Sequence, residues 1–458
     1  MNYISEDTIA ALSTAAGQSA IAVIRLSGGH SSHIMERLFK PSSKTEKQVQ
    51  HGYIVDNDKK IDEVLCTFFK APDTYTGEDL AEISCHGNPV IIKEILDLLY
   101  KNGARAAGPG EFTYRAFVNG KIDLAEAESV CALITSKTET AAKAALNNVS
   151  GEFSLKIKGV KDALTNLLAY LEVSLDHPDE EIDYLTREQK LERIENFISE
   201  IKKLIETYRT SECLQKGLRA AIIGKPNAGK SSLLNAVLGR SRAIVTEIAG
   251  TTTDTIEEII DCRGIPLTII DTAGIRTHAE NSIEILGQER SKEAVGKADI
   301  LIWIFDSSKE LDKNDLIIAE YLSASCLNTY IIGVLNKSDL PSKVSKADIS
   351  ILAKFDAFIN VSAKSGSGIP KLLDAIAKHA GISDTNNEYL LINSRHLALL
   401  QASLASINKA KENIAGKDAD ELAAFETRNA LTALNEILGI GASQDILDSI
   451  FSTFCIGK

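Results

Sequence analysis

The sequence lacks the cysteine pattern of a disulfide scaffold or of a cysteine-rich zinc site. Its seven cysteines are an odd number spread over 458 residues, and no two of them form a C-x-x-C pair. Disulfide scaffolds are short and dense in cysteine, and zinc sites of this kind use closely spaced cysteine pairs. We therefore expect free thiols and a cytoplasmic protein.

The sequence also has no long apolar run and no excess of basic residues. The first ten residues do not join a basic start to an apolar stretch, so we expect no signal peptide. Apolar runs such as 300–305 are far shorter than the roughly 20 residues that a membrane helix needs, so we expect no membrane association. The formal net charge of −13 argues against nonspecific electrostatic binding of nucleic acid by the whole surface. Any RNA would therefore have to bind at a local basic patch or through a partner protein.

The sequence has the composition of a globular protein, and it divides into four segments that differ in their pattern of apolar residues, glycine and proline. Residues 1–120 mix short strand-like runs with glycine and proline, which predicts an α+β domain. Residues 121–212 and 385–458 carry apolar residues at helical spacing, and we expect the two segments to pack together as one helical domain. Residues 217–380 alternate strands and helices, which predicts an inserted α/β domain with a mostly parallel sheet.

The strongest motif lies in the α/β segment. Residues 224–231 read GKPNAGKS and match G-x-x-x-x-G-K-[ST], after an apolar strand at 220–223 and before an amphipathic helix at 231–238. In such a loop, backbone N–H groups surround the β-phosphate, Lys230 neutralises phosphate oxygens and Ser231 offers a hydroxyl to Mg²⁺. A chance glycine-rich turn would lack the flanking strand and helix, so we predict a triphosphate site.

Two further segments predict contacts to the metal and the γ-phosphate. DTAG at 271–274 directly follows the strand 267–270, and Asp271 can reach Mg²⁺ through water while the Gly274 N–H meets the γ-phosphate. The stretch TEIAGTTTD at 246–254 offers Thr252 as a second Mg²⁺ ligand that is released after hydrolysis.

The choice of base is predicted by two other strand ends. NKSD at 336–339 follows the strand 330–335, and a buried Asp339 carboxylate would accept two N–H bonds from the guanine edge, which adenine cannot offer. SAK at 362–364 follows the strand 358–361, and its backbone would bond the guanine oxygen.

The complete set of predicted GTP-binding residues is Asn227, Ala228, Gly229, Lys230, Ser231, Ser232, Thr246, Glu247, Ile248, Ala249, Gly250, Thr251, Thr252, Asp271, Thr272, Ala273, Gly274, Asn336, Lys337, Ser338, Asp339, Ser362, Ala363 and Lys364.

With these elements in place, the chain resembles the bacterial tRNA modification GTPases of the MnmE (TrmE) family. YTGED at 75–79, PGEFT at 109–113 and CIGK at 455–458 resemble the same family, so the resemblance covers essentially the whole chain. It implies a homodimeric, GTP-hydrolysing enzyme that works with an FAD flavoprotein of the MnmG type in a heterotetramer. Together they would add an aminomethyl or carboxymethylaminomethyl group to C5 of the wobble uridine of tRNA.

The resemblance also implies a one-carbon unit from 5-formyl- or methylene-tetrahydrofolate, held by the N-terminal domain. The folate contacts fall on Arg25, Glu82, Lys121 and Lys458. Without the resemblance, Arg25 would be a surface charge and Glu82 the solvent side of a strand. His86 lies near this set and would be a structural histidine.

The family further implies hydrolysis that depends on K⁺ and on dimerisation of the GTPase domains. A monovalent cation beside the β–γ bridge can replace the charge of an arginine finger. Asn227 resembles the potassium ligand, and Thr246, Ile248 and Thr251 would add further oxygens. Ile275 stands where a water-orienting glutamine is usual, and the family's catalytic glutamate falls on Glu284. Two neighbouring glutamates, at 280 and 289, remain alternatives.

Two other functions share some of these features. A regulatory ribosome-assembly GTPase would have the same nucleotide elements but should also carry a basic RNA-binding module. An ATP-using kinase is opposed by Asp339. For Cys455, a catalytic thiol, a structural role and a contact to tRNA all stay open.

Overall fold

The computed structural model describes residues 7–43, 48–176, 185–240, 257–271, 295–325, 329–382, 389–416 and 420–458. The chain divides into two compact units. The first comprises Met1–Cys131, Asn148–Ile198 and Leu399–Lys458, and the second comprises Ala132–Asn147 and Ser199–Ala398. Residues Ala132–Asn147 join the second unit because Ala141 and Ala145 share a core with its sheet. The domain limits expected from the sequence therefore stay predictions.

The N-terminal part of the first unit is an α+β domain. Its strands are β1 (Thr8–Leu12), β2 (Ser19–Ser27), β3 (Phe39–Pro41), β4 (Val49–Asp56), β5 (Lys59–Phe69), β6 (Leu80–Gly87) and β7 (Ala104–Ala106), and its helices are α1 (Ser31–Leu38), α2 (Pro89–Lys101) and α3 (Glu111–Val118). The strands pair in the order β3-β4-β5-β6-β2-β1-β7. Only the β1–β7 pair is parallel among these described strands.

The two faces of this sheet have different neighbours. Ile24 of β2 and Ile83 of β6 lie in one core with Ile95 of α2. Successive side chains of a strand point to opposite faces. Arg25 and Glu82, which follow Ile24 and precede Ile83, therefore lie on the face opposite α2.

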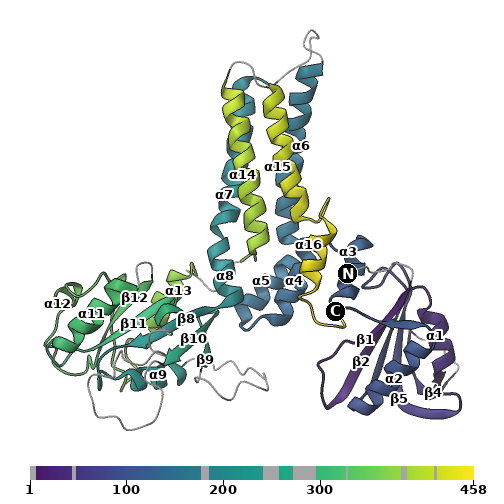
Figure 1. Ribbon diagram of the computed structural model, residues 1–458, viewed down its shortest axis with the longest axis horizontal. Helices are drawn as coiled ribbons and strands as arrows, with labels where there is room; N and C mark the ends of the chain where they lie inside the picture. Colours follow the sequence, from purple (N-terminus) through teal and green to yellow (C-terminus); the bar gives the residue numbers. More distant parts are fainter. Residues whose placement is uncertain are drawn as a thin grey trace. The chain divides into compact units, whose positions relative to one another are not determined.

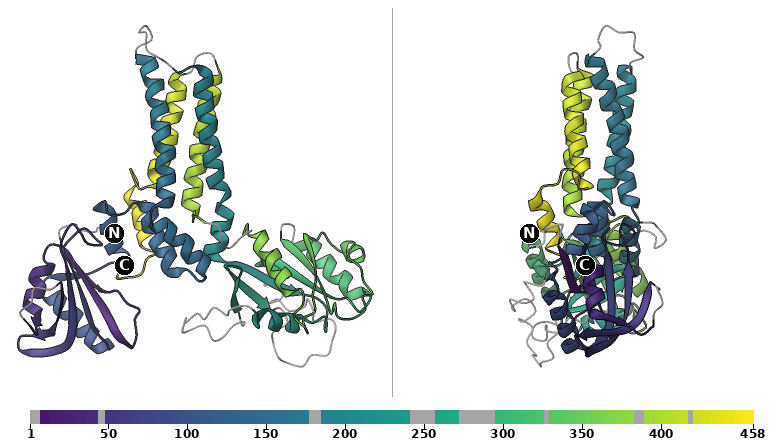
Figure 2. Two further views of the ribbon diagram at one scale, coloured as in Figure 1. Left: turned by 180° about the vertical axis from the view of Figure 1, so that it is seen from behind. Right: turned by 90° about the vertical axis from the view of Figure 1, so that its right-hand side faces the viewer.

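The helical part of the first unit contains a bundle. The helices of the two helical segments are α4 (Leu124–Thr135), α5 (Glu139–Val149), α6 (Glu152–Asp176), α7 (Arg187–Glu206), α8 (Tyr208–Lys216), α14 (Ser394–Ala415), α15 (Asp420–Ile437) and α16 (Gln444–Phe451). Helices α6, α7, α14 and α15 run side by side in both views (Figures 1 and 2). The ion pairs Lys190–Asp420 and Lys411–Glu195 join α7 to α15 and to α14. Helices on both sides of the α/β segment thus pack together.

Each helix of the described residues is too short or too polar to cross a membrane.

The second unit contains the α/β domain. Its strands are β8 (Leu218–Ile223), β9 (Glu257–Cys262), β10 (Ile265–Asp271), β11 (Ile300–Asp306), β12 (Tyr330–Asn336) and β13 (Ala357–Asn360), and its helices are α9 (Lys230–Leu238), α11 (Lys313–Ser325), α12 (Lys346–Ser350) and α13 (Ile369–His379). The strand order is β13-β12-β11-β8-β10-β9. Among the strands described, only the β9–β10 hairpin is antiparallel, which confirms the predicted mostly parallel sheet.

Helices cover both faces of this sheet because its central strands are apolar on both sides. Ile222 of β8 lies in one core with Leu233 of α9 and with residues of α13, whereas Trp303 of β11 lies in another with residues of α11 and α12. The carboxyl ends of parallel strands meet at one edge of a sheet, and ligands of open α/β folds bind there. The phosphate loop after β8, NKSD after β12 and SAK after β13 lie at this edge, and Asp271 is the last residue of β10.

Candidate functional site

The phosphate loop connects β8 to α9 and has an unusual backbone. Gly224 and Gly229 have φ values of 148° and 102°, and Asn227 has a φ of 61°. A Cβ at Gly224 would lie 2.5 Å from the carbonyl oxygen of Ile304, so only glycine fits there. A non-glycine residue in the left-handed region costs about 1–3 kcal/mol and persists only where its surroundings hold it. Hydrogen bonds from Lys230, Asn336 and Lys337 to the backbone of this loop supply that support.

Lys230 lies across the phosphate loop. Its Nζ donates hydrogen bonds to the carbonyl oxygens of Gly224 and Lys225, at 2.8 and 2.9 Å. Ser231 and Ser232 follow it in the first turn of α9, and both are exposed. An ammonium group and two hydroxyls therefore stand at a helix N-terminus, where the free N–H groups and the helix dipole favour the binding of phosphate groups.

Asn336 joins the phosphate loop to the loop that follows β13. Its side chain is buried, with 2% of the residue exposed. Its Nδ2 donates to the Ala228 carbonyl oxygen at 2.9 Å, and its Oδ1 accepts from the Ala363 N–H at 3.0 Å. One amide thus fixes two predicted nucleotide loops with respect to each other.

Lys337 forms a second link to the phosphate loop. Its Nζ donates to the Asn227 carbonyl oxygen at 3.2 Å and pairs with Asp306 Oδ2 at 2.6 Å. Burial alone raises the pKa of Asp306, but hydrogen bonds from Lys337 and Ser308 outweigh burial and lower it. The sequence reasoning missed Asp306. The feature of the sequence that could have indicated Asp306 is its position at the end of the apolar run that forms β11, where it is in register with Asn336.

Asp339 lies where the sequence placed it, but the expectation that it is buried was wrong. The residue is exposed because it follows the end of β12, beyond the edge of the sheet. Its Oδ1 accepts a hydrogen bond of 2.6 Å from Ser362 Oγ, which lowers the pKa of the carboxyl group. A bound base would have to cover this carboxylate. Ser362 therefore orients Asp339 through its side chain, in addition to any role of the SAK backbone.

Several predicted residues lie outside the described residues. These are Thr246, Glu247, Ile248, Ala249, Gly250, Thr251, Thr252, Thr272, Ala273, Gly274 and Glu284, together with the alternatives Glu280 and Glu289. Asp271 ends β10 in register with Ile222 of β8, the strand that leads into the phosphate loop. The backbone thus places Asp271 beside this loop.

A second group of predicted residues lies in the N-terminal domain. Arg25 and Glu82 are register partners on β2 and β6, and Arg25 Nη2 lies 2.7 Å from Glu82 Oε1. The Arg25 guanidinium also lies 5.3 Å from the ring centre of Tyr75 and 5.7 Å from that of Phe112. Arg25 is therefore half-buried between a carboxylate and two aromatic rings, and is not a free surface charge.

The C-terminal residues reach the same place. The Phe112 N–H donates to the Lys458 carbonyl oxygen at 3.1 Å, and the Gly110 N–H donates to the carbonyl oxygen of the exposed Cys455 at 3.3 Å. The PGEFT and CIGK segments are thus in contact, and the Arg25 guanidinium and the Lys458 backbone both lie beside Phe112. Lys121 bonds the Pro72 carbonyl oxygen at 3.0 Å, in the loop that carries Tyr75.

Buried ion pairs lie around Arg115, which follows Phe112 on α3. The Arg115 side chain is 4% exposed and pairs with Asp7, Glu78 and Glu111. Burial alone raises the pKa of Glu111, but hydrogen bonds from Arg105, the Gly108 N–H and Arg115 outweigh the effect of burial and lower this pKa. The glutamates of YTGED and PGEFT, Glu78 and Glu111, both pair with Arg115, a contact that the sequence did not predict. His86 lies apart and pairs with Asp62 at 2.7 Å.

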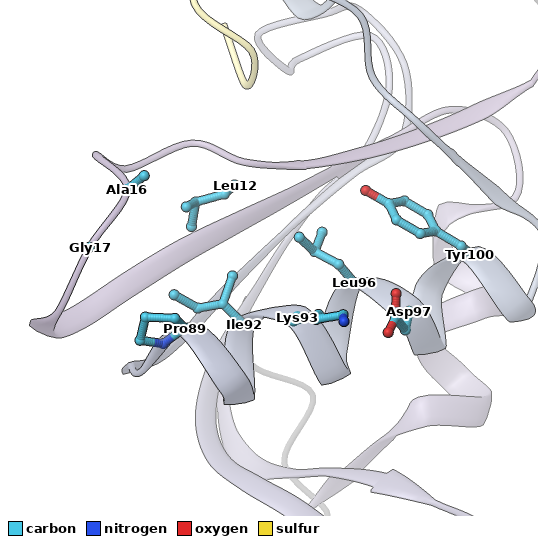
Figure 3. A pocket seen from close by; sticks show the side chains of 9 residues that line it. All are labelled: Leu12, Ala16, Gly17, Pro89, Ile92, Lys93, Leu96, Asp97 and Tyr100. Atoms are coloured by element: carbon cyan, nitrogen blue, oxygen red, sulfur yellow. The ribbon is translucent and has the colours of Figure 1, made fainter.

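A pocket of about 310 Å³ opens on the other face of the N-terminal sheet. Figure 3 shows its lining between the β1–β2 connection and α2, and the lining residues are Leu12, Ala16, Gly17, Pro89, Ile92, Lys93, Leu96, Asp97 and Tyr100. Arg25, Glu82, Lys121 and Lys458 do not line it. The pocket and the predicted folate residues are therefore separate features of the domain.

The fold of the second unit and its loops define a P-loop nucleotide-binding protein of the GTPase class. Two family models match the chain: "GTP-binding protein TrmE N-terminus" over residues 8–121 and "MnmE helical domain" over residues 124–455. A tRNA modification GTPase MnmE from Endomicrobium trichonymphae is 64% identical over the full length of both chains. Proteins of the same name from Alkaliphilus metalliredigens and Aquifex aeolicus are 41% and 40% identical, over 99% of this chain and at least 99% of theirs. The chain belongs to the MnmE family of tRNA modification GTPases.

Proposed function

We propose that the chain hydrolyses GTP in the modification of tRNA. The observation that carries this proposal is the Asn336 amide, which bonds Ala228 in the phosphate loop and Ala363 in the SAK loop. This contact organises a phosphate site and a base site around one buried side chain. The printed name of the relatives, tRNA modification GTPase, supports the same activity.

The nucleotide site suits Mg²⁺ and K⁺. The exposed Ser231 stands at the start of α9, and Asp271 ends the neighbouring strand. Both residue types carry the oxygen donors that Mg²⁺ prefers. Thr252 would complete the Mg²⁺ site. Asn227 is exposed on the phosphate loop, where its amide oxygen suits K⁺, with Thr246, Ile248 and Thr251 as further ligands. Ser231, Asp271, Thr252 and Asn227 would hold these cations, which would supply positive charge beside the phosphates, and Glu284 would orient the attacking water.

The N-terminal site suits a tetrahydrofolate derivative. A flat heterocycle with donors and acceptors on its edge matches two aromatic rings beside an arginine–glutamate pair. Lys121 and Lys458 would meet its anionic tail. With an MnmG-like FAD flavoprotein in a heterotetramer, the homodimer would then transfer an aminomethyl-type group to C5 of the wobble uridine in the cytoplasm.

Base selectivity tests the GTPase part. Asp339→Asn replaces a carboxylate acceptor by an amide donor, so it mismatches the N–H edge of guanine and matches the oxygen that xanthine carries there. We expect the variant to lose GTP hydrolysis and to gain XTP hydrolysis, measured as phosphate release in buffer with Mg²⁺ and K⁺. Wild-type protein that prefers ATP would overturn the proposal.

Mass spectrometry of wobble nucleosides tests the tRNA part. Cells without the protein should lose the C5-modified uridine, and the wild-type gene should restore it. An Asn227→Ala gene should restore it poorly, because hydrolysis by that variant would respond weakly to K⁺. Unchanged nucleosides together with intact GTP hydrolysis would point to a regulatory GTPase.

A further inference from the structure

Lys225, the second residue of the phosphate loop, has a side chain that the nucleotide motifs do not explain. This side chain is only 12% exposed. Its Nζ lies 2.7 Å from Asp315 Oδ2 and 3.0 Å from Asp312 Oδ2. Burial alone lowers the pKa of Lys225, but the hydrogen bonds to Asp315 and Asp312 outweigh burial and raise it. Lys225 is therefore a charged group that bridges two carboxylates.

The two carboxylates form the start of α11. Asp312 Oδ1 accepts from the Asn314 N–H at 2.8 Å, and Asp315 Oδ2 accepts from the Asp312 N–H at 3.0 Å. Each carboxylate thus accepts a hydrogen bond from one backbone N–H at the N-terminus of the helix. The Asp315 side chain is 1% exposed, and its Oδ1 has no hydrogen-bond partner among the described residues. A buried carboxylate of this kind needs a cation beside it, and Lys225 provides one.

The main chain of Lys225 takes part in the phosphate site. Its carbonyl oxygen accepts from Lys230 Nζ at 2.9 Å and from the Ala228 N–H at 3.3 Å. The residue that is anchored to α11 by its side chain thus also holds the lysine that meets the phosphates. Asn336 and Lys337 fix the other side of the loop, at Ala228 and Asn227.

We propose that Lys225 is a positioning residue for nucleotide binding and hydrolysis. Its ion pairs with Asp312 and Asp315 fix the first half of the phosphate loop on α11, and this keeps the Lys225 carbonyl and Lys230 in place. The loop then presents its N–H groups without having to order them when GTP binds, which favours both affinity and turnover. The inference rests on the proposed GTP hydrolysis.

The test compares Lys225→Met and Lys225→Arg with a control, Lys216→Met, which removes a lysine–glutamate pair on the surface of α8. For Lys225→Met we expect GTP affinity and kcat/KM to fall at least tenfold, because the loop is no longer anchored. The arginine variant and the control should stay near wild type. Asp312→Asn keeps a helix cap but removes one of the two charges that hold Lys225. It should therefore weaken GTP binding by about threefold, less than the tenfold loss expected for Lys225→Met.

A double variant separates positioning from the loss of a buried charge partner. In Lys225→Met/Asp315→Asn the unpaired charge is gone while an amide oxygen can still accept from the Asp312 N–H, so the thermal midpoint should rise above that of Lys225→Met. If GTP affinity stays at least tenfold weaker, Lys225 positions the loop. If GTP affinity returns with the midpoint, or if neither Lys225→Met nor Asp312→Asn weakens GTP binding, the proposal is overturned. Wild-type protein without GTP hydrolysis would overturn the proposed function instead.

Discussion

Replacing Asn336 by alanine should separate the phosphate loop from the SAK loop. The change removes two hydrogen bonds, of 2.9 Å to the Ala228 carbonyl and of 3.0 Å from the Ala363 N–H. At about 1 kcal/mol for each bond, the loss is about 2 kcal/mol, and a carbonyl left buried without a partner adds to it. Ala228 is 1% exposed, so water does not readily replace the amide at that carbonyl. Since 2 kcal/mol is a factor of about 30, GTP affinity should fall by at least that factor.

Titration with a fluorescent GTP analogue in Mg²⁺ and K⁺ measures this loss. Asn360→Ala is the matched control, because Asn360 is an exposed asparagine at the end of β13. Thermal unfolding of both variants shows whether the domain stays folded. If Asn336→Ala binds GTP within threefold of wild type while the domain stays folded, the Asn336 amide does not organise the site, and the main argument for the proposed function fails.

Three more predictions follow from single contacts. Gly229→Ala should weaken GTP binding at least as much as Asn336→Ala, because a Cβ at Gly229 would collide with Asn336 Nδ2. The double variant should lose less binding free energy than the sum of the two single losses. Full additivity in a double-mutant cycle would contradict this coupling. Glu111 has a pKa below its ordinary 4.5, so its stabilising effect is present above pH 4.5 and is lost as pH falls through the lowered pKa. Thermal midpoints recorded against pH should therefore fall in acid for the wild type, and less so for Glu111→Gln. Arg25→Met should weaken 5-formyl-tetrahydrofolate binding at least about tenfold without changing GTP hydrolysis, and equal affinity by calorimetry would remove Arg25 from the site.

The strands of the α/β domain could be predicted because their signals are local. Runs such as 300–305 are apolar at every residue, and each glycine-rich or polar loop follows directly after such a strand. The same reasoning could not foresee that Asp339 is exposed, because burial depends on how far the loop after β12 extends beyond the sheet. It also missed Asp306 and Asp315, since an aspartate near a strand or helix end has many ordinary roles and only its partner shows which one it has.

The sequence by itself determined the order of the nucleotide motifs, the strand–loop–helix context of each, and the family. These depend on residue type and on spacing along the chain. The tertiary structure alone decided which distant side chains meet: Lys225 with Asp315, Asn336 with Ala228, and Arg25 with Glu82. The physical reason is that hydrogen bonds and ion pairs act over a few ångströms in space, and folding brings together groups that are separated by 57 to 108 positions in the chain.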